Sequence, residues 1–172
     1  MQSGSDDHLK QLTQQLAELM IENKHRLVTA ESCTGGWLAK CCTDLSGSSA
    51  WFDRGFVTYS NDAKKTDLHV PENTLDKFGA VSENTAIAMT EDALVNTSAN
   101  LSVAITGIAG PDGGTQSKPV GTVCFAFGVK NKKTISLTQH FEGNREMVRR
   151  QALVTALQGI IKNARDTLNS MG

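Results

Sequence analysis

Residues 32–36 read Ser-Cys-Thr-Gly-Gly, and residue types in this arrangement can support nucleophilic chemistry. The short apolar run at 26–28 predicts a buried strand before them, and the residues from 37 onward are typical of a helix. At such a turn, backbone N–H groups and the helix N-terminus present positive partial charge. A hydroxyl placed there can attack a carbonyl carbon while neighbouring N–H groups receive the oxyanion. Alternatively, Ser32 or Thr34 caps the helix and the glycines allow close packing.

A lysine at position 64 is a candidate base for this chemistry. In a strand, Tyr59 and Asn61 share a face, and Lys64 then falls in the first turn of the following helix. The positive end of the helix dipole disfavours the charged form of a lysine, and burial lowers its pKa further. A neutral lysine can take the proton of a serine hydroxyl, as in Ser–Lys hydrolases. The alternative is that Lys64 and Lys65 are both solvated on the surface.

Arginines gather near the start of a helix expected over residues 144–168. They are Arg145, Arg149 and Arg150. Cations are unfavourable at a helix N-terminus, so the cluster indicates a bound anion such as a phosphate. The alternative is that these arginines pair with Glu142 and Glu146.

A loop rich in glycine and proline spans residues 107–119. It follows an expected central strand, and open α/β sheets bind ligands where such strands end. Long loops inside compact domains are usually functional or mobile. The glycine spacing fits neither a Walker motif nor a G-x-G-x-x-G motif, so a dinucleotide-binding fold is not indicated. The alternative is a surface loop without a role.

The elements that must position these residues alternate between helix and strand. Apolar periodicity and turn residues predict helices over about 6–23, 37–45, 62–68, 72–78, 82–95 and 144–168. The predicted strands are 26–30, 55–59, 101–106, 120–129 and 133–141. This order predicts an α/β fold, a single three-layer α/β/α domain with a mixed sheet over residues 1–172. Residues 1–7 are polar, and we expect them to be mobile.

Composition limits the function classes. The chain has 172 residues, 39% hydrophobic and 20% charged, as expected for one soluble globular domain. A net charge of −1 gives no indication of a nucleic-acid partner. Without a membrane-length apolar stretch or a signal peptide, we expect a cytoplasmic protein that does not contact membranes. The four cysteines and four histidines lack zinc-site spacing, so no metal site is expected.

Five segments, in this order, resemble the CinA C-terminal domain family, the nicotinamide-nucleotide amidase (NMN deamidase) family. They are residues 31–36, 59–64, 79–82, 106–111 and 118–123. The resemblance covers about residues 8–168 and is to the stand-alone form, without the additional N-terminal domain of longer members. It implies hydrolysis of the carboxamide of nicotinamide mononucleotide (NMN) to nicotinate mononucleotide and ammonia, without a metal or other cofactor, in pyridine nucleotide recycling. The alternative is a catalytically weak or inactive paralogue that binds pyridine nucleotides.

The resemblance also implies catalytic roles. The serine of the family's ESxTGG motif matches Ser32, and the lysine of its YSN-x-x-K segment matches Lys64, which implies a Ser–Lys mechanism. The tyrosine of that segment and the threonine of the TGIAGP motif match Tyr59 and Thr106. Cys33 fills the variable position of the first motif. Although a thiolate is intrinsically the better nucleophile, the resemblance favours Ser32.

The expected substrate contacts come from the turn, the glycine loops and the last helix. They are Thr34, Gly35, Gly36, Asn61, Gly107, Gly110, Arg145 and Arg149. N–H groups of residues 33–36, with Thr106, are expected to stabilise the oxyanion, and Tyr59 to orient Lys64 or relay a proton. The arginine of the family's last-helix segment best matches Arg145, with Arg149 as a second candidate, and the resemblance implies that it holds the 5′-phosphate of NMN. NMN is the expected small-molecule partner, and a homodimer is expected by analogy.

Overall fold

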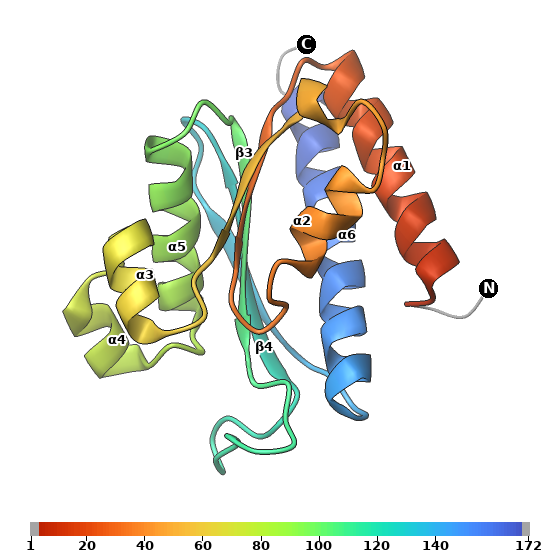
Figure 1. The fold of residues 1–172 in the computed structure, drawn as a ribbon. Helices are drawn as coiled ribbons and strands as arrows, with labels where there is room; N and C mark the ends of the chain where they lie inside the picture. Colours follow the sequence, from red (N-terminus) through yellow and green to blue (C-terminus); the bar gives the residue numbers. More distant parts are fainter. Residues whose placement is uncertain (1–3, 170–172) are drawn as a thin grey trace.

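The computed structural model describes residues 4–169, which fold into helices packed on both faces of one sheet (Figure 1). The strands are β1 (Leu27–Glu31), β2 (Phe52–Val57), β3 (Leu101–Gly107), β4 (Thr122–Val129) and β5 (Ile135–His140). The helices are α1 (Asp6–Glu22), α2 (Trp37–Thr43), α3 (Asn61–Leu68), α4 (Glu72–Phe78), α5 (Glu83–Val95) and α6 (Arg145–Asn169), with a short 3-10 helix η1 (Ser48–Ala50). Each predicted helix and strand is present.

The sheet is mixed, with the strand order β2-β1-β3-β4-β5. β1 pairs in parallel with β2 on one side and β3 on the other, whereas β4 and β5 are antiparallel to their neighbours. The carboxyl ends of β1, β2 and β3 therefore lie at one edge of the sheet. The connection through α2 covers one face and the connection through α3, α4 and α5 covers the other (Figure 1). Because the two connections diverge, a ligand-binding crevice is expected where β1 ends.

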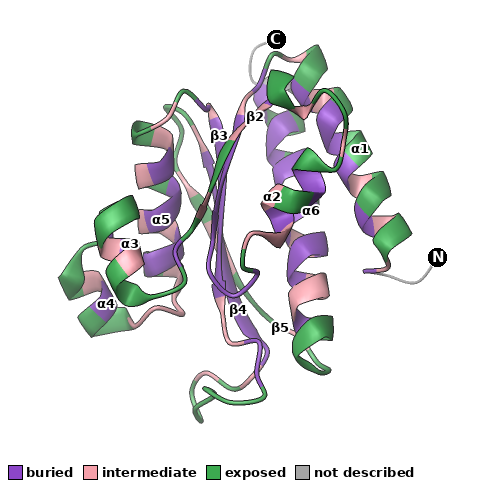
Figure 2. Cartoon of the chain, viewed as in Figure 1, coloured by how far each residue is buried: buried purple, intermediate pink, exposed green. Residues whose placement is uncertain are grey.

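Two apolar cores lie on opposite faces of the sheet (Figure 2). The larger core lies beneath α1, α2 and α6, and the smaller beneath α3, α4 and α5. Every residue of β1 is buried, as expected for a strand covered on both faces. Successive residues of β1 serve the two cores in turn, with Leu27 in the larger and Val28 in the smaller. The three-layer α/β/α prediction is confirmed.

Some element ends differ from the predictions. β2 ends at Val57 rather than near residue 59, because Ser60 is the N-cap of α3 and accepts a hydrogen bond from the Ala63 N–H. Residues 1–7 were expected to be mobile, but Asp6 and Asp7 form the first turn of α1, while residues 1–3 lie outside the described part of the chain. No helix between residues 4 and 169 is long and apolar enough to cross a membrane.

Candidate active site

Ser32 and Lys64 meet at the edge of the sheet where β1 ends. Ser32 follows β1, and its backbone N–H donates to the Ile105 carbonyl oxygen on β3 at 2.9 Å. The first turn of α3 brings Lys64 to it, so that Lys64 Nζ lies 3.0 Å from Ser32 Oγ. Only 1% of Lys64 is exposed. Two residues far apart in sequence therefore form one buried polar contact.

Two backbone carbonyls hold the Lys64 amine from the other side. Nζ lies 2.8 Å from the Thr58 oxygen and, at a longer 3.5 Å, from the Tyr59 oxygen. Across the described residues, no carboxylate pairs with Lys64. Burial lowers the pKa of Lys64 below its ordinary value. A neutral amine held by these carbonyls directs its lone pair toward the Ser32 hydroxyl, as a general base requires.

The pair opens onto a pocket of about 260 Å³. Eight of the twelve predicted site residues line it: Ser32, Tyr59, Asn61, Lys64, Thr106, Gly107, Gly110 and Arg145. They come from the turn after β1, the start of α3, the end of β3 with its following loop, and the start of α6. All three segments expected beside the turn, 59–64, 106–110 and 145–149, therefore contribute at least one residue to a common cavity.

Arg145 places a cation at this pocket. It is the first residue of α6, and its guanidinium donates to the Gly110 carbonyl oxygen at 2.8 Å and to the Tyr59 hydroxyl at 3.0 Å. Arg145 forms no ion pair with a carboxylate of the described chain, so its remaining N–H groups can bind an anion. The Tyr59 hydroxyl is engaged by Arg145, and Tyr59 approaches Lys64 through its carbonyl rather than through its side chain.

Thr106 lines the pocket at the end of β3, on the strand next to the one that Ser32 follows. It is buried, and its hydroxyl donates to the Ala80 carbonyl oxygen at 2.8 Å. The Thr106 hydroxyl therefore uses its only proton in a hydrogen bond to the 79–82 segment. Thr106 thus contacts that segment, and its part in stabilising the oxyanion stays a prediction.

The structure does not bring Thr34, Gly35, Gly36 and Arg149 to the pocket that Ser32 lines. They line a second groove, of about 810 Å³, formed by α1, α2 and α6. Thr34 is buried there, and its hydroxyl donates to Glu31 Oε1 at 2.7 Å. The substrate contacts predicted for Thr34, Gly35 and Gly36 rested on the N–H groups where α2 begins, and the next N–H groups of that helix, on Leu38 and Ala39, are held by Glu31.

The N-terminus of α2 is capped by Glu31, a residue that sequence analysis did not include among the site residues. Glu31 is fully buried, and its carboxylate accepts the backbone N–H groups of Leu38 at 2.9 Å and Ala39 at 3.0 Å. Burial raises the pKa of Glu31, and these hydrogen bonds oppose the rise. A carboxylate is favoured at the positive end of a helix. An acidic residue ending a buried strand just before a Gly-Gly turn was the sequence signal for this cap.

Cys33 is a poor candidate for the nucleophile. Its thiol is buried in the larger core, and burial raises its pKa to about 12. The thiolate is the reactive form of cysteine, and at neutral pH it is a negligible fraction of such a thiol. The geometry therefore favours Ser32 over its neighbour.

A family model described as "CinA C-terminal domain" matches residues 9–164. The chain belongs to the CinA C-terminal domain family. This CinA domain is 51% identical over 154 residues to the "Nicotinamide-nucleotide amidohydrolase PncC" of Escherichia coli K12, a match that covers 90% of this chain and 93% of that protein.

Solved structures of CinA proteins have the same fold. The competence/damage inducible protein CihA from Agrobacterium tumefaciens superposes on this CinA domain with a TM-score of 0.87 at 42% identity, covering 90% of this chain and 94% of that one. A CinA superfamily protein from Klebsiella pneumoniae 700603 gives a TM-score of 0.88 at 35% identity, covering 92% and 98%. The mixed five-stranded sheet described above is therefore the family's fold.

Proposed function

We propose that this CinA domain hydrolyses the carboxamide of NMN to nicotinate mononucleotide and ammonia, with Ser32 as the nucleophile and Lys64 as the base, in pyridine nucleotide recycling. The observation that carries the proposal is the 3.0 Å contact of Lys64 Nζ with Ser32 Oγ in a buried site without a carboxylate partner among the described residues. The substrate is supported by relatives named nicotinamide-nucleotide amidohydrolase, which are 51% and 44% identical to this chain.

In the first half-reaction, the Lys64 amine removes the hydroxyl proton of Ser32 as Oγ bonds to the carboxamide carbon. The electron pair of the C=O bond moves onto its oxygen. Lys64, now protonated, gives its proton to the amide nitrogen; the oxyanion's electron pair re-forms the C=O bond as the C–N bond breaks, and ammonia departs, leaving an ester on Ser32. Water then adds to the ester carbon with Lys64 again as base. The ester bond breaks, Oγ recovers a proton and nicotinate mononucleotide is released.

The oxyanion requires a donor close to Ser32, and the Cys33 N–H meets this need. Gly35 N–H is already bonded to the Ser32 carbonyl oxygen at 3.0 Å, and Glu31 holds the N–H groups at the start of α2. Within residues 4–169, no oxygen accepts the N–H of Cys33 or that of Thr34, and the Cys33 N–H is the one adjacent to the nucleophile. Loss of one such donor typically lowers turnover about 10²–10³-fold.

The 5′-phosphate of NMN is the anion that Arg145 would bind. Arg145 has no carboxylate partner among the described residues, and Gly110 and Tyr59 fix its guanidinium at the pocket. Binding energy from this remote group can be used to align the carboxamide on Ser32. NMN should therefore be a far better substrate than nicotinamide riboside or nicotinamide, which lack the phosphate.

The test is ammonia release by the pure protein from NMN, nicotinamide riboside and nicotinamide, measured beside direct NMN binding. We expect kcat/KM to be highest for NMN. Tight NMN binding without ammonia release would contradict the proposal and identify the chain as a nucleotide-binding paralogue. Faster release from a carboxamide other than NMN would contradict the substrate assignment.

A further inference from the structure

Arg149 reaches the turn beside the nucleophile from the groove formed by α1, α2 and α6. Its Nε donates to the Cys33 carbonyl oxygen and its Nη2 to the Thr34 carbonyl oxygen, both at 3.1 Å. The guanidinium carbon lies 5.2 Å from the ring centroid of Trp37, within range of a cation–π contact. No carboxylate of the described chain forms an ion pair with Arg149. Its charge is therefore directed at two backbone carbonyls.

The hydrogen bonds of this turn connect Arg149 to the N–H next to Ser32. The C=O and N–H groups of a trans peptide point in opposite directions. Arg149 binds the oxygen of the Thr34–Gly35 peptide, and the N–H of that same peptide, on Gly35, donates to the Ser32 oxygen at 3.0 Å. The Ser32 oxygen in turn belongs to the peptide that carries the Cys33 N–H. Two peptides in series thus join the guanidinium to that donor.

Such a chain polarises each of its members. A cation bonded to the first carbonyl strengthens the N–H of the same peptide as a donor, and this effect passes to the next peptide. The second contact, to the Cys33 oxygen, fixes the orientation of the peptide between the two. The Cys33 N–H is left with no oxygen acceptor among the described residues and adjoins the attacking oxygen.

We infer that Arg149 is a positioning residue for the oxyanion: through the Thr34–Gly35 and Ser32–Cys33 peptides it orients and polarises the Cys33 N–H that receives the negative charge. This inference rests on the proposed amidase function. It gives Arg145 and Arg149, both on α6, separate tasks, because Arg145 would bind the phosphate and Arg149 would act on the reacting carbonyl through the backbone. Arg149 thus affects the transition state more than the bound ground state.

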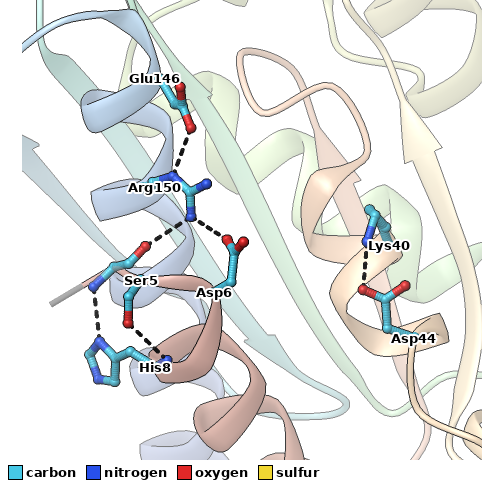
Figure 3. A network of polar contacts seen from close by, with 8 residues as sticks. Ser5, Asp6, His8, Lys40, Asp44, Glu146 and Arg150 are labelled. Carbon is cyan, nitrogen blue, oxygen red and sulfur yellow. Dashed lines mark hydrogen bonds and ion pairs between the residues drawn. The ribbon is translucent and has the colours of Figure 1, made fainter. Parts of the chain in front are cut away.

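Arg150 offers a matched control. It is the next residue of α6, and its guanidinium carbon also lies over Trp37, 4.9 Å from the ring centroid. Its hydrogen bonds go to Glu146, Asp6 and the Gly4 carbonyl oxygen, and not to the turn (Figure 3). Loss of Arg150 removes a cation from the same helix and the same aromatic ring while the turn keeps its partners.

The experiment compares two ligands on wild type, Arg149→Ala, Arg149→Lys and Arg150→Ala. One ligand is the product, nicotinate mononucleotide. The other is the 3-carboxaldehyde analogue of NMN. Ser32 Oγ bonds to its aldehyde carbon, the hydroxyl proton passes to Lys64, and the C=O electron pair moves onto the oxygen at the Cys33 N–H. The affinity of each protein for the two ligands is measured by calorimetry, and its kcat and KM for NMN are measured by steady-state kinetics.

We expect Arg149→Ala to lower kcat and the affinity for the aldehyde by about 10–100-fold, somewhat less than outright loss of an oxyanion donor. The affinity for product should change less than threefold. Arg149→Lys should be intermediate, because an ammonium cannot hold both carbonyls in the planar fork of a guanidinium. Added guanidinium chloride at low millimolar concentration should restore part of the kcat of Arg149→Ala, and Arg150→Ala should keep wild-type kcat and affinities.

Unchanged kcat and aldehyde affinity in a folded Arg149→Ala protein would overturn the inference while leaving the proposed function intact. An equal loss of aldehyde and product affinity, without guanidinium rescue, would also overturn it, because Arg149 would then only maintain the shape of the turn. If wild type itself releases no ammonia from NMN, the proposed function fails and the inference fails with it.

Discussion

Lys64 can act as a base because its amine is removed from water and has backbone carbonyls, not carboxylates, for neighbours. A carboxylate partner would favour the charged amine and raise its pKa, whereas burial alone lowers it. The amine therefore loses its proton at a lower pH than an exposed lysine does. This property belongs to one residue, and in the proposed mechanism it sets the pH dependence of the reaction.

The expected pH dependence of activity follows from the lowered pKa of Lys64. The kcat/KM for NMN should rise with pH as Lys64 loses its proton and reach a plateau below pH 10.5, the ordinary lysine pKa. Lys64→Arg should be about 10²-fold less active or worse across the range, because a guanidinium does not deprotonate. Lys65→Arg is the control, since Lys65 pairs with Asp62 and Glu72 and should keep the wild-type profile. A rising profile retained in Lys64→Arg would exclude Lys64 as the base.

Arg145 provides a second prediction at the scale of one residue. Arg145→Gln should lower kcat/KM for NMN about 10–100-fold, as expected for loss of hydrogen bonds to a charged phosphate. The weak activity on nicotinamide riboside should not change. Steady-state kinetics on both substrates check this, with the exposed Arg165→Gln as control. Equal losses on the two substrates would show that Arg145 does not bind the phosphate.

Among the elements, the junction of β1 with α2 determines how the serine is presented. Glu31 is the last residue of β1 and its carboxylate caps α2, so one residue links the strand before the turn to the helix after it. Glu31→Gln should lower the free energy of unfolding by about 1–3 kcal/mol, because the buried backbone N–H groups of Leu38 and Ala39 lose a charged acceptor. Urea denaturation measures the change. The exposed Glu18→Gln should alter stability by less than about 0.5 kcal/mol, and an equally small effect at Glu31 would contradict the cap.

The same junction shows what sequence patterns can and cannot predict. The periodicity of apolar residues correctly predicted the strand, the turn and the helix, and it predicted that Ser32 lies in the turn between them. It could not show that Glu31 fills the helix N-terminus, because that contact depends on how β1 packs against α2. Thr34, Gly35 and Gly36 were therefore assigned to substrate, although they line the groove on the other side of the turn from the Ser32 pocket.

At the scale of the whole molecule, the sheet topology makes the site. Parallel pairing of β1 with both β2 and β3 gathers three strand ends at one edge, and the diverging connections leave a crevice there. The spatial meeting of Ser32 with Lys64 and Arg145 was expected from the family resemblance rather than from the local pattern. The side of the turn on which Arg149 lies was not predictable, because it depends on how α6 packs against α1.

The most direct test of the account is the initial rate of ammonia release from NMN by Ser32→Ala beside Cys33→Ala, with folding checked by circular dichroism. Ser32→Ala removes only the hydroxyl that Lys64 contacts, so we expect a loss of at least about 10³-fold with the fold intact. Cys33→Ala leaves the backbone N–H in place and should stay within about tenfold of wild type. Near wild-type ammonia release by Ser32→Ala, or loss of activity in Cys33→Ala alone, would contradict the account.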